Sequence, residues 1–240
     1  MTTVESFAGI ERAFFSKLGD LGFAPRCVLD IGASNGSWSS MIAEVFPEAR
    51  FEMFEPLAGR RPEYDAGLAS VMASRSNLRL HPVALGSENG EAAFWSETAG
   101  VGSSLLVGNV PAEEKITVPV RRLDDAVRDA GIAPPEIIKV DVQGGEMQVL
   151  RGGRETFAAA DVLHLETWLR RGYGQQTPLL HELIDALRPM GFVLVQFGDF
   201  WRHPDQELVS VDAFFAARRL IERLREQRRG FPWPGNWWEG

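Results

Sequence analysis

Four carboxylates of this sequence close or follow short apolar runs that are typical of buried strands: Asp30, Glu55, Asp141 and Glu166. Asp30 can order the loop that follows it or accept a hydrogen bond from an ammonium group. Glu55 comes about twenty residues after that loop, where nucleotide-binding α/β folds place an acidic residue on the two hydroxyls of a ribose. Such hydrogen bonds are stronger than neutral ones because their acceptor is charged. The pattern indicates a site for a nucleoside.

A glycine-containing turn, Gly32-Ala33-Ser34-Asn35-Gly36, follows the first apolar run. Gly32 allows a tight turn, and Gly36 permits close approach of a ligand or of the next helix. The turn does not match the dinucleotide fingerprint G-x-G-x-x-G, because Ser34 replaces the second glycine, and the chain has no G-x-x-x-x-G-K-[ST] phosphate loop. A ligand with an adenosine and no phosphates fits this turn. The alternative is a turn that needs glycine only for its backbone geometry.

The elements that must hold these residues alternate between strands and helices. Apolar runs predict strands at 27–31, 50–54, 77–85, 91–95, 115–121, 136–142, 162–167, 192–197 and 207–211. Helical spacing predicts helices at 6–21, 38–46, 62–72, 123–130 and 178–188, with Ser37 as N-cap of the second. This alternation predicts an α/β fold with a mostly parallel sheet and helices on both faces. Its ligands should bind beyond the carboxyl ends of the strands, where the strand order reverses.

Length and composition agree with one α/β domain. The chain has 240 residues, and 45% of them are hydrophobic, which is enough for a well-buried core. The formal net charge of -8 argues against nucleic acid as a partner, because binding to phosphates needs clustered Lys and Arg. The one basic cluster, 218–229, contains Glu222 and Glu226 and predicts a solvated helix face.

The sequence also predicts the compartment. Cys27 is the only cysteine, so an internal disulfide is impossible and a reducing compartment fits. Residues 1–15 contain no apolar stretch of signal-peptide type, and no segment approaches the ~20 apolar residues of a membrane span. We therefore expect a soluble cytoplasmic protein with no membrane span.

Several stretches of the chain, taken together, resemble the FkbM family of class I methyltransferases. The resemblance covers residues 28–215. It rests on 30–36, Phe54-Glu55-Pro56, 83–86 with Gly90, 102–105, 118–125, 138–146, 149–152, Leu165-Glu166 and 211–215. The stretch from Asp141 to Glu146 and its spacing to Glu166 are the most specific elements. Two positions depart from the family pattern: Gln143 replaces the usual Glu, and His81-Pro82 stands where Asn is common.

The resemblance implies a Rossmann-like class I methyltransferase fold. It has a mostly parallel seven-stranded sheet, helices on both faces and a final antiparallel strand. We expect a single domain over 1–240, with 1–25 as an N-terminal helical extension and 216–240 as a C-terminal helix and Trp-rich tail. The cofactor implied is S-adenosyl-L-methionine. Its implied binding residues are Asp30, Gly32, Ala33, Ser34, Asn35, Gly36, Trp38, Glu55, Pro56, Ala84 and Asp141.

The resemblance further implies methylation of a hydroxyl on a sugar, a glycan or a glycosylated natural product. A hydroxyl is a poor nucleophile at neutral pH, so a general base is expected. Asp141 is the first candidate and Glu166 the second. His164 is the third, because strand alternation places it on the same face as Glu166; its alternative role is a hydrogen-bonded core residue. Asp141 and Glu166 could instead hold a divalent cation that lowers the pKa of the acceptor.

Other interpretations stay open. A nucleotide-binding oxidoreductase could use the same fold, although Ser34 argues against it, and a methyltransferase-like module could have lost catalysis. An N-methyltransferase is a further alternative, although the Asn/Asp-Pro-Pro-Tyr type of motif is absent after the fourth strand. Residues 100–108 and 168–176 are candidate segments around a small-molecule or glycan acceptor. The tryptophans in 231–238 must cover their apolar surface on the domain, in a homodimer interface or over the acceptor site.

Overall fold

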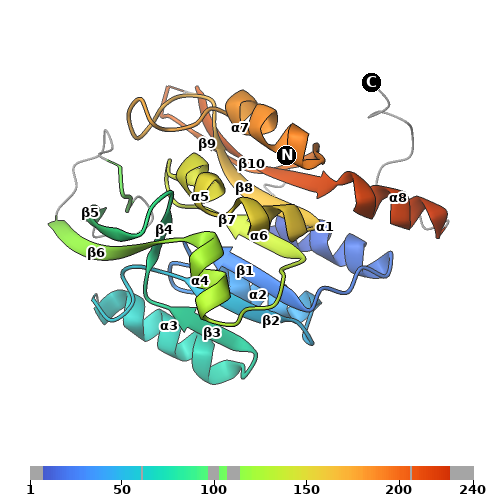
Figure 1. The fold of residues 1–240 in the computed structure, drawn as a ribbon, viewed down its shortest axis with the longest axis horizontal. Helices are drawn as coiled ribbons and strands as arrows, with labels where there is room; N and C mark the ends of the chain where they lie inside the picture. Colours follow the sequence, from blue (N-terminus) through green and yellow to red (C-terminus); the bar gives the residue numbers. More distant parts are fainter. Residues whose placement is uncertain (1–7, 61, 97–102, 107–113, 206, 228–240) are drawn as a thin grey trace.

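A computed structural model describes residues 8–60, 62–96, 103–106, 114–205 and 207–227, and its centre is a seven-stranded sheet (Figure 1). The strands follow the order β3-β2-β1-β7-β8-β10-β9. Their bounds are β1 (Cys27–Ile31), β2 (Arg50–Phe54), β3 (Leu78–His81), β7 (Ile137–Val140), β8 (Val162–Trp168), β9 (Phe192–Arg202) and β10 (Leu208–Ala217). Only β10 runs antiparallel to its neighbours β8 and β9. The predicted mostly parallel sheet with a final antiparallel strand is confirmed.

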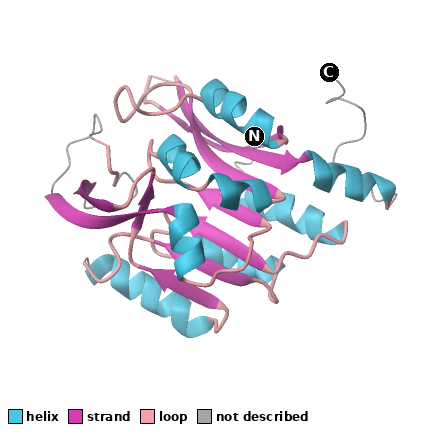
Figure 2. Cartoon of the chain, in the orientation of Figure 1, coloured by secondary structure: helices cyan, strands magenta, loops and turns pink. Residues whose placement is uncertain are grey.

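Helices cover both faces of this sheet, as predicted (Figure 2). On one face, α1 (Ala8–Asp20), α2 (Ser37–Val45), α3 (Pro62–Ser74) and α8 (Arg218–Glu226) pack on a core that includes Phe15, Phe51 and Phe214. On the other, α4 (Leu123–Asp129), α5 (Glu146–Gly152), α6 (Arg154–Ala159) and α7 (Leu180–Leu187) pack on a second core around Phe157 and Leu163. A short 3₁₀ helix, η1 (Arg188–Met190), follows α7.

A second, three-stranded sheet lies beside the main one. It has the order β4-β6-β5 and consists of β4 (Ala84–Gly86), β5 (Gly90–Ser96) and β6 (Glu114–Arg122). The prediction of one strand over 77–85 was wrong, because the chain leaves the main sheet after His81 and enters the small sheet at Ala84. Pro82 lies at the break, where its missing N–H cannot join a strand ladder.

Several local predictions need correction. Helices α5 and α6 were not predicted, because the two short helices follow each other too closely to show a long helical period. The N-cap of α2 is Gly36 rather than Ser37, and the Asn35 side chain accepts the N–H of Ser37 at 3.0 Å. The last strand pair is longer than predicted, and α8 begins only at Arg218.

The two ends of the described chain belong to the main core. In α1, Phe14, Phe15 and Leu18 are buried, so the predicted N-terminal extension packs on the sheet. In α8, three apolar side chains are buried, while Arg219 and Arg223 pair with Asp161 at 3.0 and 2.8 Å. The basic cluster therefore has an apolar face and two anchored arginines. The Trp-rich tail lies outside the described residues. Within the described ranges, no helix is long and apolar enough to cross a membrane.

Candidate active site

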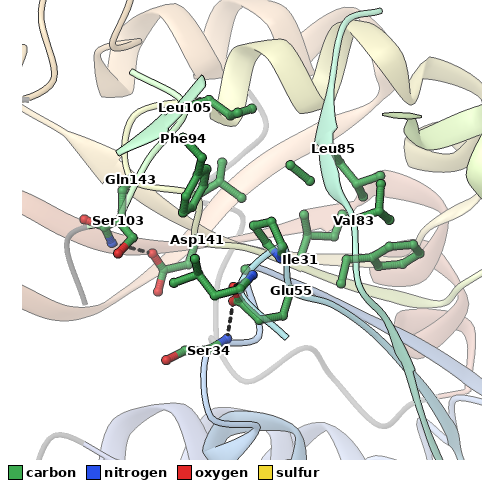
Figure 3. A pocket seen from close by; sticks show the side chains of 17 residues that line it. Ile31, Ser34, Glu55, Val83, Leu85, Phe94, Ser103, Leu105, Asp141 and Gln143 are labelled. Carbon is green, nitrogen blue, oxygen red and sulfur yellow. Dashed lines mark hydrogen bonds between the residues drawn. The ribbon is translucent and has the colours of Figure 1, made fainter. Parts of the chain in front are cut away.

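A cleft lies at the carboxyl ends of β1, β2 and β7, and the small sheet forms one of its walls (Figure 3). Its cavity volume is about 190 Å³. Its lining residues are Ile31, Gly32, Ser34, Phe54, Glu55, Pro56, Leu57, Val83, Ala84, Leu85, Phe94, Ser103, Leu105, Asp141, Val142, Gln143 and Gly145. The position agrees with the prediction that ligands bind where the strand order reverses, since β1 lies between β2 and β7.

The turn after β1 needs glycine at its first position. Gly32 has φ +79°, and a Cβ atom there would lie 1.8 Å from the backbone oxygen of Asp141. The turns after β1 and β7 therefore approach too closely for any side chain. Ser34 and Gln143, with φ of 49° and 55°, are the non-glycine residues with positive φ in the described ranges, and both line the cleft. Backbone strain of this kind costs about 1–3 kcal/mol per residue and is concentrated at functional sites.

Glu55 is a buried carboxylate that lines the cleft. Only 5% of the residue is exposed, and its two oxygens accept the N–H groups of Ser34 at 2.8 Å and Leu57 at 2.9 Å (Figure 3). Burial raises the pKa of Glu55 to about 7, although both N–H donors act in the opposite direction. Each carboxylate oxygen has a second lone pair. Glu55 can therefore accept two further hydrogen bonds, as a ribose diol would supply.

Lys139 is a site residue that the sequence analysis did not single out. Its Nζ donates to the backbone oxygen of Gly32 at 3.1 Å and lies 3.2 Å from Asp30 and 3.6 Å from Asp141. Burial lowers the pKa of Lys139, but the two carboxylates outweigh burial and hold this pKa above its usual value. The available signal was a charged residue within the apolar strand Ile137-Ile138-Lys139-Val140, because a buried lysine needs partners.

Asp30 acts beneath the cleft rather than in it. It is fully buried, and its second oxygen accepts the Ser39 hydroxyl at 2.6 Å. With Lys139, whose ammonium nitrogen lies 3.2 Å from it, Asp30 connects β1, α2 and β7. Its role in ordering the loop stays a prediction.

Asp141 and Glu166 lie on neighbouring strands, as predicted, and one amide bridges them. Gln143 Nε2 donates to Asp141 Oδ1 at 2.7 Å and to Glu166 Oε2 at 3.0 Å, and the Tyr173 hydroxyl donates to Gln143 Oε1 at 2.7 Å. Burial, and then the charge of Asp141, raise the pKa of Glu166 well above its usual value. The departure from the family pattern at Gln143 thus has a physical role, since an amide can donate where a glutamate would repel both carboxylates.

Glu146 shapes the loop that carries Asp141. It is 2% exposed, and its Oε1 accepts the N–H groups of Gly144 at 3.0 Å and Val142 at 3.3 Å. Burial raises its pKa to about 8. The Glu146 carboxylate therefore stabilises the turn that follows Asp141.

The structure brings together some of the predicted site residues and separates others. Gly32, Ser34, Glu55, Pro56, Ala84 and Asp141 line the cleft. Asp30, Ala33, Asn35, Gly36 and Trp38 do not line it; Ala33 and Trp38 are buried in the core beneath α2. His164 does not line the cleft either. Its ring stacks on Phe214 with 4.5 Å between the ring centroids, and its Nε2 lies 3.3 Å from Glu11 Oε1. Parts of the two predicted acceptor segments reach the site, namely Ser103 and Leu105 at the cleft and Tyr173 through Gln143.

A sequence model of the methyltransferase FkbM domain matches residues 30–194, more than half of the chain and a range that encloses every cleft residue. The chain belongs to the FkbM methyltransferase family. It is a methyltransferase, and the resemblance given by its motifs is confirmed.

One sequence relative and two solved structures are similar to this chain. The 2-O-methyltransferase NoeI of Sinorhizobium fredii is 30% identical over 186 residues, which cover 71% of this chain and 74% of NoeI. The magnesium protoporphyrin IX methyltransferase ChlM of Synechocystis, solved with bound S-adenosylmethionine, shares the fold at a TM-score of 0.51 and 13% identity, over 88% of this chain and 77% of ChlM. The FkbM methyltransferase of Methylobacillus flagellatus is 21% identical with a TM-score of 0.49; the match covers 79% of this chain but only 43% of that protein.

Proposed function

We propose that this FkbM-family methyltransferase uses S-adenosyl-L-methionine to methylate a hydroxyl of a sugar, a glycan or a glycosylated natural product. The observation that carries the proposal is the cleft at the ends of β1, β2 and β7, which is lined by the buried Glu55 and by Asp141. The name of NoeI, a 2-O-methyltransferase, supports oxygen as the methylated atom. The sugar acceptor rests on the family resemblance.

The cofactor would be held by residues that the cleft presents. Glu55 would accept hydrogen bonds from both ribose hydroxyls, and Phe54, Leu57, Val83 and Leu85 offer an apolar surface for an adenine. Gly32 also lines the cleft, so its backbone could contact the remaining part of the ligand. Bound there, S-adenosylmethionine would supply a methyl group activated by its sulfonium.

Asp141 is the proposed base or orienting group for the acceptor hydroxyl. Its side chain is 37% exposed, so it is accessible from the cleft, while Lys139 and Gln143 fix its position. As the new carbon–oxygen bond forms and the carbon–sulfur bond breaks, the hydroxyl proton would pass to Asp141 or, through it, to water. Glu166 remains the second candidate. His164 is the weakest, because it faces Glu11 and Asp212 instead of the cleft.

A divalent cation between Asp141 and Glu166 is not part of this proposal. The Gln143 amide already donates to one oxygen of each carboxylate, and an amide nitrogen is not a ligand for hard cations. A cation at this place would require the Gln143 amide nitrogen to leave both carboxylates, by a flip of the amide or by rotation of the side chain.

The test uses tritium in the methyl group of S-adenosylmethionine and a panel of free and lipid-linked oligosaccharides. We expect label in an acceptor with the wild-type protein and none with Asp141→Asn, which keeps the size and shape of the side chain. Calorimetry with S-adenosylhomocysteine is the matched control: Asp141→Asn should bind it nearly normally, whereas Glu55→Ala should bind about tenfold more weakly or worse. Folded wild-type protein that binds no S-adenosylhomocysteine would contradict the proposal.

A further inference from the structure

A second cluster of polar side chains lies on the face of the main sheet that α1 covers, and none of its residues lines the cleft. It consists of Glu11 from α1, His164 from β8 and Asp212 from β10, and each offers one ligand atom within 4.8 Å of the others. These residues are far apart in the sequence, so only the fold brings them together. The methyl-transfer chemistry proposed above uses none of their contacts with one another.

The imidazole of His164 is held firmly but has no hydrogen bond. The residue is 2% exposed, and its ring is stacked on Phe214 with an interplanar angle of 7°. Both ring nitrogens are buried without a hydrogen-bond partner. Buried polar atoms are nearly always hydrogen-bonded, and an absent ion is one of the few explanations for an exception.

The spacing of the donor atoms fits a shared ion better than direct hydrogen bonds. His164 Nε2 lies 3.3 Å from Glu11 Oε1 and 3.7 Å from Asp212 Oδ2. Hydrogen bonds from nitrogen to oxygen are shorter, about 2.7–3.2 Å. Around a tetrahedral Zn²⁺ with bonds of about 2.1 Å, neighbouring donor atoms are about 3.4 Å apart. The two observed separations lie on either side of that value.

The charge balance also favours a cation. Two carboxylates, with Asp199 as a third acidic neighbour, face a single imidazole. Lys139 is the nearby basic residue, but its ammonium group contacts Asp30, Asp141 and the Gly32 carbonyl.

We infer that Glu11, His164 and Asp212 form a binding site for a divalent transition-metal ion of the Zn²⁺ type. One imidazole with two carboxylates suits such an ion, whereas Mg²⁺ and Ca²⁺ prefer oxygen ligands alone. The ion would join α1 to β8 and β10 and leave at least one coordination position open to water. This inference is independent of the proposed methyl transfer.

The test uses the full chain without a histidine tag, stripped with a chelator and titrated with ZnCl₂ in a calorimeter. We expect one ion per chain and a higher melting temperature with Zn²⁺, because an ion that binds only the folded state stabilises it. Glu11→Gln and Asp212→Asn should each weaken binding about tenfold or more. His203→Asn is the control, because it removes an exposed His–Asp pair (His203 Nδ1 to Asp205 Oδ2, 3.0 Å) that could bind zinc adventitiously.

Two results would overturn the inference: no Zn²⁺ binding by the folded wild-type protein, or binding that only His203→Asn weakens. If the ligand variants fail to fold, X-ray absorption of the wild-type zinc complex decides the matter, because the site requires one imidazole and oxygen ligands and no sulfur. Binding of S-adenosylhomocysteine is measured separately, so a failed metal site and a failed cofactor cleft give different results.

Discussion

Replacing Lys139 with methionine tests the electrostatic basis of the cleft. The substitution keeps most of the aliphatic chain and removes the charge. Asp30, which is fully buried, then loses its cation at 3.2 Å, and the Gly32 carbonyl loses its donor at 3.1 Å. Only the Ser39 hydroxyl continues to donate to Asp30.

Breaking a buried ion pair by removing one partner costs about 3–5 kcal/mol. Lys139 is 9% exposed in its side chain, so solvent screening reduces this figure little. We therefore expect Lys139→Met to lower the free energy of unfolding by about 3 kcal/mol or more at pH 7.

Urea unfolding followed by circular dichroism measures this effect, and Asp30→Asn with Lys139→Met is the matched control. The double variant has no unpaired charge at this position, so we expect it to recover about half of the lost stability. A loss below about 1 kcal/mol in Lys139→Met, the value of an exposed pair, would refute the reasoning. So would a double variant that is no more stable than Lys139→Met alone.

Three further predictions concern the cleft. The pKa of Glu55 is raised to about 7, so the affinity for S-adenosylhomocysteine should fall as the pH is lowered from 8 to 6. Below pH 7 the affinity should approach a loss of about tenfold per pH unit. Calorimetry of Glu55→Gln should show no such pH dependence. Gly32→Ala should abolish binding of S-adenosylhomocysteine and lower the free energy of unfolding by about 2 kcal/mol or more. Gly59→Ala is the control, because Gly59 also has positive φ but open space around it, and it should lower the free energy of unfolding by only about 1–2 kcal/mol, as measured in urea. Tyr173→Phe should lower kcat and leave S-adenosylhomocysteine affinity unchanged, because its hydroxyl acts on Gln143; an equal loss in both would contradict that role.

The sequence was informative where local pattern and tertiary structure agree. The strand at 27–31, its glycine turn and Glu55 were predictable because a buried parallel strand is a short apolar run and a tight turn needs glycine. The same logic placed Asp141 beside Glu166, since neighbouring strands end at the same edge. The break at Pro82 was also visible in principle, because proline cannot donate to a strand ladder.

Other features depend on contacts that no local pattern contains. Ser34 lines the cleft, yet Ala33 in the same turn and Trp38 in α2 are buried in the core. The wall that Phe94 and Leu105 provide depends on the small sheet, whose parallel pairing of β4 with β6 joins segments more than thirty residues apart. Sequence periodicity does not determine such a pairing.

Strand register explains why the polar residues form a continuous row. Asp30 is opposite Lys139, Lys139 is opposite His164, and Glu166 is opposite Asp212. Residues that face each other in adjacent strands point to the same side of a sheet, so all five belong to the face covered by α1 and α2. A buried charge is tolerated only with a partner: Lys139 lies between Asp30 and Asp141, and His164 lies between Glu11 and Asp212. A register shift of one residue in β7 or β8 would turn these groups toward the core around Phe157, so the same pairing that forms the cleft also restricts the sheet to one register.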